Sequence, residues 1–342
     1  MHRRLAVLIL FVSFAVLAAH AQSALPPDAP AQPQPAVSAA PGNLSTKTPR
    51  TEDWSKLPLA QSGLQSSTFN AVLLSKVEQP QYTRELLRVE WRRGDNIDLY
   101  IIKPHGVTKP PTILYLYDYK FDTDRFREDG WCLQATRGGF AAVGFVSALS
   151  GQRFHAPRPM KEWFVSELQE ALATSTHDVQ MILNYLVSRG DVDASQVGIF
   201  AQGSGGAIAV LAAGVDSRIQ ALDLLNPWGD WPDWLKDSAQ IPENERADYL
   251  KPEFLQQVSA LDPLLYLPHL QLKALRLQQI LDDTVTPPSA RDKIAAAAPH
   301  TEQVDRYKDT AAHVKAWRAN GLNGWLRQQL QPAPLETASK LP

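Results

Sequence analysis

One stretch of the sequence decides the fold, VGIFAQGSGGAIAV, which runs from Val197 to Val210. Its apolar start, Val197 to Phe200, predicts a short buried strand, and the glycines that follow predict a sharp turn. The small apolar residues from Gly206 to Ala213 then predict a helix. The stretch therefore has the form of strand, tight turn and helix, and in open parallel sheets ligands bind at such turns, beyond the carboxyl ends of the strands.

Strands and helices alternate on both sides of this stretch. Two short alternating segments, Leu87 to Trp91 and Asp98 to Ile102, predict a hairpin. Further strands are predicted at 112–117, 141–146, 221–225, 275–281 and 303–307, and helices at 131–138, 166–189, 288–298 and 314–329. This alternation predicts an α/β fold with a mostly parallel central sheet flanked by helices. Residues 226–269 predict a helical insertion that caps the site, before the strand at 275–281.

The N-terminal residues predict export. Residues 1–21 combine two arginines, an apolar run and Ala19-His20-Ala21, the pattern of a secretory signal peptide cleaved after Ala21. Residues 22–50 are rich in Pro and Ala and predict a disordered tether. We expect one domain over residues 51–330 and a flexible tail over 331–342. The mature protein is therefore expected to be secreted or periplasmic.

Composition narrows the classes of partner. The chain has 34 Lys and Arg against 36 Asp and Glu, and signal cleavage removes two basic residues and no acidic one. A negative net charge disfavours nucleic acid and, after signal cleavage, a membrane surface as partners. Cys132 is the only cysteine, so no internal disulfide is expected. Because the sequence has no HExxH, P-loop or G-x-G-x-x-G motif, we expect no metal and no cofactor.

Three motifs together resemble those of the α/β-hydrolase superfamily, particularly its dienelactone-hydrolase and prolyl-oligopeptidase-like branches. They are DVDASQVGIFAQGSGGAIA, ILDDTVTPP and YKDTAAHV, in the family's chain order of nucleophile, acid and histidine. The resemblance covers roughly Leu87 to Leu330. It implies the α/β-hydrolase fold, with a helical insertion before the strand that bears the acid.

The resemblance also implies two members of a catalytic triad. Asp283 matches the family's acid in the D-x-x-V-P turn, where a carboxylate orients the histidine. The alternative is that Asp282 or Asp283 only caps the turn before a helix that begins with proline. His313, 30 residues after Asp283, matches the general base and is expected in a loop after the last strand.

The nucleophile has two alternative registers. When the preceding strand is matched, the family's G-x-S-x-G-G falls on AQGSGG, so that Gly203 occupies the nucleophile position. The other register gives that position to Ser204 but places the bulky Gln202 where the family has glycine. Gly203 adopts the strained elbow conformation at no steric cost, whereas the neighbouring glycines allow a shifted turn that presents Ser204.

The oxyanion donors also differ from the family's pattern. If Ser204 is the nucleophile, the backbone N–H of Gly205 is one expected donor. After the strand TILYLY the family usually has His-Gly, but this sequence has Tyr117-Asp118-Tyr119. Tyr117 or Tyr119 is therefore a second candidate donor, with plain packing as the alternative.

Two further segments follow strands and are expected near the site. Arg153 and His155 in SALSGQRFHAPR are candidates for binding an anionic group of a substrate, or they belong to a solvated loop. Trp228 and Trp231 in NPWGDWPDW are candidates for stacking on a substrate, or they form the hydrophobic seat of the insertion.

Two functions follow from these alternatives. One is an exported serine hydrolase, esterase-like or peptidase-like, that acts on a small molecule or peptide through an acyl-enzyme, with Ser204, Asp283 and His313 as its triad. The other is a catalytically inactive, hydrolase-like binding protein with Gly203 at the nucleophile position. The backbone at the turn discriminates between them.

Overall fold

The computed structural model describes residues 71–92, 94–119, 123–148, 153, 168–299, 304–320 and 324–330. The predicted signal peptide, tether and C-terminal tail lie outside these residues, as does His155.

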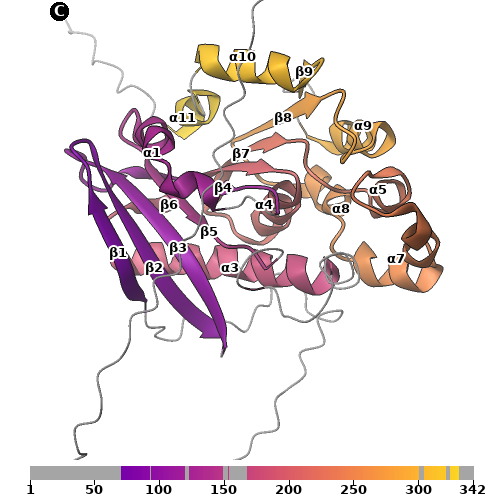
Figure 1. Ribbon diagram of the computed structural model, residues 1–342, viewed down its shortest axis with the longest axis horizontal. Helices are drawn as coiled ribbons and strands as arrows, with labels where there is room; N and C mark the ends of the chain where they lie inside the picture. Colours follow the sequence, from indigo (N-terminus) through magenta and orange to yellow (C-terminus); the bar gives the residue numbers. More distant parts are fainter. Residues whose placement is uncertain are drawn as a thin grey trace, which may run out of the picture. The chain divides into compact units, whose positions relative to one another are not determined.

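The described residues form a sheet of nine strands in the order β1-β2-β3-β5-β4-β6-β7-β8-β9 (Figure 1). Strands β1 to β3 pair antiparallel, as do β3 and β5, and the remaining neighbours are parallel. The mostly parallel sheet and the hairpin of β2 and β3 are thus confirmed. The strands are β1 (Val72–Glu78), β2 (Tyr82–Arg92), β3 (Asp95–Pro104), β4 (Pro111–Leu116), β5 (Ala141–Phe145), β6 (Asp193–Gln202), β7 (Ile219–Leu225), β8 (Ala274–Ile280) and β9 (Val304–Tyr307).

Helices cover both faces of the sheet. Helices α3 and α4 pack together on one face, and α1 and α11 contact strands through a second apolar cluster. The α-helices are α1 (Asp129–Thr136), α3 (Leu168–Arg189), α4 (Ser204–Val215), α5 (Trp231–Asp237), α6 (Arg246–Tyr249), α7 (Pro252–Ser259), α8 (Pro263–Tyr266), α9 (Pro288–Ala297), α10 (Thr310–Asn320) and α11 (Gly324–Leu330). Short 3₁₀ turns lie at η2 (Asp124–Arg127), η4 (Glu243–Glu245) and η5 (Leu267–His269).

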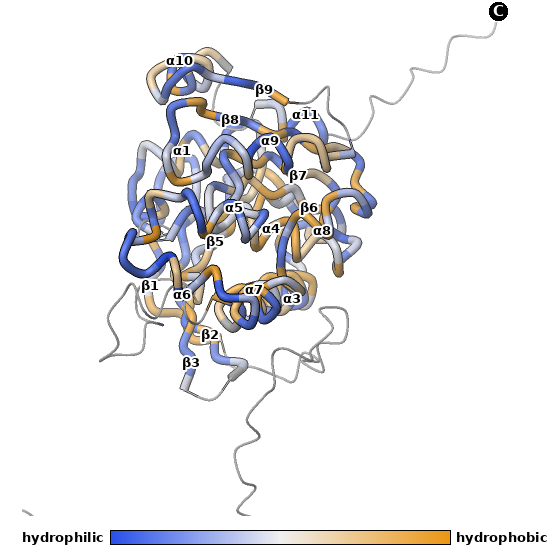
Figure 2. Tube along the Cα trace, turned by 90° about the vertical axis from the view of Figure 1, so that its right-hand side faces the viewer, coloured by the Kyte–Doolittle hydropathy of each residue, from blue (hydrophilic) through white to orange (hydrophobic). Residues whose placement is uncertain are grey.

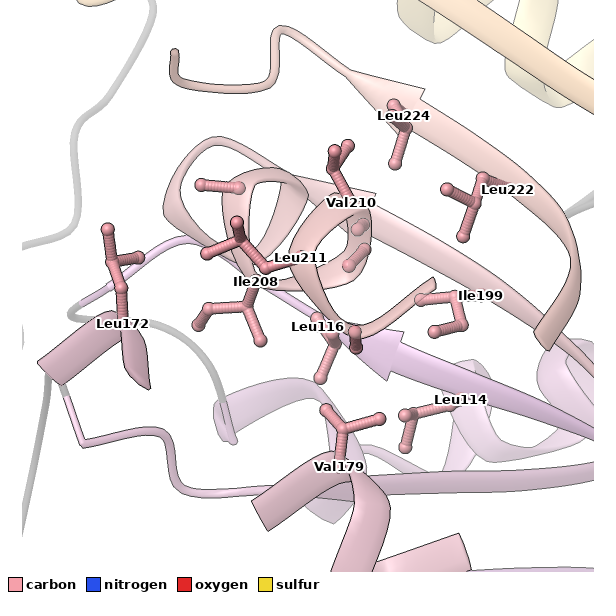
Figure 3. Close-up of a cluster of buried hydrophobic side chains, with 14 of the residues drawn as sticks. Leu114, Leu116, Leu172, Val179, Ile199, Ile208, Val210, Leu211, Leu222 and Leu224 are labelled. Carbon is pink, nitrogen blue, oxygen red and sulfur yellow. The ribbon is translucent and has the colours of Figure 1, made fainter. Parts of the chain in front are cut away.

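The core beneath the turn after β6 holds that turn in place. Leucines and other branched residues of β4, β6 and β7 meet the apolar faces of α3 and α4 (Figure 3). Leu114, Ile199, Leu222 and Leu211 are each fully buried in this layer. Burial of each such side chain stabilises the fold by about 1.5–3 kcal/mol, so both ends of the β6–α4 turn are firmly anchored.

Three elements differ from those predicted. Strand β1 is an additional edge strand, and its mostly exposed residues give no alternating pattern to detect. Helix α4 begins at Ser204, two residues before the predicted start, because the turn is tighter than the glycine count suggested. The single closing helix predicted at 314–329 is replaced by α10 and α11, and His313 lies within α10 rather than in a loop.

Helix α10 packs loosely on the rest of the chain. None of its described side chains is buried, and Figure 2 shows both hydrophobic and hydrophilic residues along it. Across the part of the chain that the structure describes, no helix has the length and apolarity needed to cross a membrane.

Candidate functional site

A cavity of about 460 Å³ lies at the carboxyl ends of the central parallel strands. Its lining residues come from the ends of β6, β7 and β8, from the segments that directly follow these strands and β4, from η2 and from α10. This is where an open α/β sheet binds ligands. The predicted helical insertion contributes only Asn226 and Trp228 to the lining, so α10, rather than the insertion, supplies the helical wall.

Gly203 occupies the turn between β6 and α4. Its backbone has φ 55° and ψ −120°, a conformation that is strained for residues with a side chain. The two glycines that follow allow close packing: a Cβ added at Gly205 would lie 2.1 Å from the Leu116 carbonyl oxygen, and one at Gly206 would lie 2.7 Å from Cβ of Pro227. Packing therefore places Gly203, with no side chain, at the point of the elbow.

Ser204 is the first residue of α4 and is buried beneath the elbow. It is 1% exposed and is not among the residues that line the cavity. Its Oγ donates to Oδ1 of Asp118 at 2.9 Å and accepts from the backbone N–H of Tyr119 at 2.9 Å. Ser204 thus binds neighbours below the turn, and His313 is not one of its described partners.

Asp118 fills the space that the missing side chain leaves. A Cβ at Gly203 would lie 2.5 Å from Cγ of Asp118, which is far closer than atoms approach in proteins. Oδ1 of Asp118 accepts from the backbone N–H groups of Tyr119 at 2.9 Å and of Ser204 at 3.1 Å. In this strand–turn–helix arrangement, the N–H after the nucleophile position and an N–H from the loop after the neighbouring strand form the oxyanion hole. In this chain the Asp118 carboxylate accepts from the two N–H groups at the corresponding positions.

The surroundings of Asp118 oppose its ionisation. Burial raises the pKa of Asp118 to about 6, and the negative charge of Asp283 acts in the same direction. Hydrogen bonds from Ser204 and from the backbone of Tyr119 favour the charged form and limit the rise in pKa. Asp118 was not among the residues singled out from the sequence, although it is the first charged residue after the buried strand TILYLY.

Asp283 lies beside the cavity and organises the loop after β8. Its Oδ1 accepts from the backbone N–H of Val285 at 3.2 Å, and its Oδ2 accepts from that of Thr286 at 3.1 Å. Oδ2 also accepts from Nδ2 of Asn226 at 3.0 Å. The carboxylate thus caps the turn, as the simpler interpretation of ILDDTVTPP proposed, while it also faces the cavity.

Asn226 joins the ends of β7 and β8. Its Oδ1 accepts from the backbone N–H of Ile280 at 2.9 Å, and its backbone has φ 42°, in the left-handed region that asparagine tolerates. In the sequence, Asn226 was predicted only as the start of the insertion. The position directly after a buried strand was the signal that could have marked it.

His313 lines the cavity from the first turn of α10. Its ring contacts Tyr307 edge to face, with ring centroids 5.1 Å apart. Burial lowers the pKa of His313, the negative charge of Asp223 opposes this shift, and the positive charge of Arg276 adds to it, so the neutral ring is favoured at pH 7. Among the described residues, no hydrogen bond joins the imidazole to Asp283. The cavity thus brings Asp283 and His313 together as lining residues, without a described hydrogen bond between them.

The side chains of Tyr117 and Tyr119, the two candidate oxyanion donors, have different contacts in the structure. The Tyr117 hydroxyl accepts a hydrogen bond from the Trp131 indole at 2.9 Å, and burial raises its pKa. The Tyr119 ring is buried and contacts Trp228, with centroids 6.1 Å apart. It is the backbone N–H of Tyr119, together with that of Ser204, that donates to Oδ1 of Asp118.

Arg153 is buried and serves the fold. It pairs with Asp95 at 2.7 Å and with Asp178 at 2.5 Å, and its side chain is 2% exposed. An arginine that is enclosed by two carboxylates cannot also receive an anionic substrate, so its predicted binding role is corrected to an internal ion pair.

The tryptophans of NPWGDWPDW form a packed cluster. Trp231 is 1% exposed and contacts Trp234 with centroids 5.8 Å apart, and Trp234 contacts Trp228 at 4.7 Å. Trp231 does not line the cavity, so it packs in the hydrophobic core of the insertion and does not stack on a substrate. Trp228 belongs to the same cluster and borders the cavity at one edge.

Metal ligands do not gather at this site. Within the described ranges, no group of three or more His, Cys, Asp or Glu side chains is arranged to hold a metal ion.

Comparisons with known proteins identify the fold. No family model and no curated protein sequence matches the chain. Among solved structures, acetyl xylan esterase from Paenibacillus sp. R4 matches with a TM-score of 0.60 and 18% identity, covering 75% of this chain and 88% of that one. Acetyl xylan esterase 1 from Thermoanaerobacterium sp. JW/SL YS485 matches at 0.58 and 16%, covering 72% and 82%. Glucuronoyl esterase from Solibacter usitatus matches at 0.54 and 12%, covering 78% and 88%.

These similarities confirm the α/β-hydrolase fold that the three motifs implied. At such low identities they concern the fold, because one fold can carry many functions.

Proposed function

We propose that this protein uses the α/β-hydrolase fold to bind a small molecule in the cavity beside Gly203, without forming an acyl-enzyme. The observation that carries the proposal is the filled oxyanion hole. Asp118 places a carboxylate oxygen 2.9 Å and 3.1 Å from the two backbone N–H groups that would stabilise a tetrahedral intermediate. A negatively charged intermediate has no place where a carboxylate already accepts both hydrogen bonds.

The elbow supports the same proposal. The strained position belongs to Gly203, and Ser204 is buried with its hydroxyl bonded to Asp118. An acyl-enzyme needs a hydroxyl that faces the substrate and lies within reach of a base. The competing function, a serine hydrolase with Ser204, Asp283 and His313 as its triad, requires the turn to rearrange so that Ser204 enters the cavity.

Ester turnover discriminates between the two functions. We expect native protein and Ser204→Ala to hydrolyse p-nitrophenyl acetate at equal rates, because any residual hydrolysis would not pass through Ser204. A triad that depended on Ser204 would lose at least about a thousandfold in kcat on this substitution.

Two further variants complete the comparison of ester turnover between native protein and Ser204→Ala. Ser188→Ala, on α3 and outside the cavity lining, removes a serine whose hydroxyl donates to the nearby Tyr185 carbonyl. Turnover is also measured for His313→Ala, which removes the base of the competing triad. A large loss of turnover in both Ser204→Ala and His313→Ala, with none in Ser188→Ala, would overturn the proposal in favour of the serine hydrolase.

Export is a separate proposal, based on the N-terminal segment. We propose that the chain acts after export, as residues 1–21 predict. Intact mass of protein secreted from an expressing bacterium tests this proposal, since cleavage after Ala21 makes Gln22 the first residue.

A further inference from the structure

The filled oxyanion hole changes the chemistry that this end of the cavity offers. In an open hole, two N–H groups point at the ligand and favour an electronegative oxygen. Here Oδ1 of Asp118 takes both of them, as well as the hydroxyl of Ser204. What the ligand meets is therefore an acceptor with negative charge in place of two donors.

We infer that the cavity binds a small organic ammonium ion whose N–H groups pair with the Asp118 carboxylate. This inference rests on the proposed function, that the cavity binds a ligand without acyl transfer.

The second oxygen of Asp118 is available for such a ligand. Oδ2 has no hydrogen-bond partner among the described residues, and it lies 2.7 Å from where a Cβ of Gly203 would stand, so it occupies the space of the missing side chain. Both Asp118 and Gly203 line the cavity. A carboxylate with one oxygen fixed by three hydrogen bonds and the other oxygen unpartnered is preorganised to accept a charged donor.

The remaining charges around the cavity also favour a cation. Asp282 and Asp283 line the cavity with Asp118. Among the described lining residues, Arg125 carries the positive charge; it is exposed and lies over the Tyr117 ring at 5.2 Å from its centroid. Burial lowers the pKa of His313, which favours its neutral form at pH 7. A positive ligand therefore relieves repulsion between carboxylates that Arg125 only partly offsets.

Aromatic rings provide the apolar part of the site. Tyr117, Phe200, Trp228 and Trp317 line the cavity, and the indole of Trp317 comes from the loosely packed α10. Rings attract cations through their negatively charged faces and also bury the hydrocarbon part of a ligand. The volume of about 460 Å³ suits a small molecule.

A series of matched probes tests the inference. Benzylammonium, benzyl alcohol and benzoate have nearly the same shape and differ in charge. We expect native protein, titrated at pH 7 by calorimetry, to bind benzylammonium about tenfold or more tightly than benzyl alcohol, and benzoate most weakly. Equal affinities, tighter binding of benzoate, or binding of none of the three would overturn the inference.

A variant then assigns the preference to Asp118. Asp118→Asn keeps an oxygen that accepts from Tyr119 and Ser204 but removes the charge, so we expect the preference for benzylammonium to disappear. Asp248→Asn removes an exposed carboxylate outside the cavity lining and should leave the preference unchanged. An undiminished preference in Asp118→Asn would contradict the assignment.

The two proposals fail in different ways. Turnover that depends on Ser204 would overturn the proposed function. The order of the three affinities would still show whether the cavity prefers a positively charged ligand. A reversed order would overturn the charge preference and would leave the absence of acyl transfer standing.

Discussion

Gly203 and Asp118 depend on each other at the residue scale. The glycine adopts φ 55° without strain, and its missing side chain leaves room for the Asp118 carboxylate. Neither residue alone explains the filled oxyanion hole. A side chain at 203 would displace the carboxylate. Without the carboxylate, the N–H of Ser204 would lose its described acceptor, whereas the N–H of Tyr119 would keep Oγ of Ser204.

Substitution of Gly203 tests this dependence. We expect Gly203→Ala to lower the free energy of unfolding by about 2 kcal/mol or more, since it adds backbone strain of about 1–3 kcal/mol and a contact with Asp118. Urea denaturation measures the loss. Gly130→Ala is the matched control, because a Cβ there meets nothing within 4 Å. A loss below about 0.5 kcal/mol for Gly203→Ala would show that the elbow is elsewhere.

At the scale of elements, the site depends on how the ends of β7 and β8 are joined. Asn226 connects them through its hydrogen bonds to Ile280 and Asp283. These bonds fix the loop that carries Asp283 to the cavity. Without them, Asp283 would retain, among its described partners, the backbone N–H groups of Val285 and Thr286 in its own turn.

The loss of this connection should be measurable. We expect Asn226→Ala to reduce the free energy of unfolding by about 2 kcal/mol, from two lost hydrogen bonds and a left-handed backbone that alanine disfavours. Asn226→Gly relieves the backbone cost and should lie between native and Asn226→Ala in urea denaturation. Equal stability of native and Asn226→Ala would mean that the two strand ends hold together without the side chain.

Most elements could be predicted because they repeat a local pattern. The apolar runs that became β4, β5, β7 and β8 are buried on both faces, and the long pattern ending at Gly190 became α3. The exposed β1 has no such pattern. The break between α10 and α11 was missed although the sequence marks it, because Asn320-Gly321 and Asn323-Gly324 are turn signals within 314–329.

The site was harder to predict because its contacts join distant parts of the chain. Asp283 and His313 lie in local motifs, and both line the cavity. Asp118 meets Ser204 across 86 positions, and Asn226 meets Asp283 across 57, so no short pattern marks either pair. Arg153 follows a strand as a binding residue would, but its partners, Asp95 and Asp178, are far away in the sequence.

At the scale of the whole molecule, the ionisation of Asp118 in the cavity affects the stability of the fold. Its pKa rises from 3.8 in the unfolded chain to about 6 in the fold, mainly because the carboxyl is buried. Between these values the folded state holds the proton more strongly than the unfolded state does. This contribution to stability is therefore complete below about pH 4 and is lost as pH rises through about 6.

The pH dependence has a definite sign. We expect Asp118→Asn, which carries no titrating group, to gain stability relative to native protein as pH rises from about 4 to 7, by up to ~3 kcal/mol. Urea denaturation of both proteins at several pH values measures the difference. A difference that stays constant over this range, or that shrinks as pH rises, would show that Asp118 is not held in a buried hole.

The central claim is that the elbow presents no nucleophile and that the oxyanion hole is already filled. Intact-mass analysis after treatment with a fluorophosphonate probe tests it most directly, because the probe forms a stable adduct with an activated serine. We expect no adduct on folded native protein. An adduct on native protein that disappears in Ser204→Ala and persists in Ser188→Ala would contradict it and identify Ser204 as a working nucleophile.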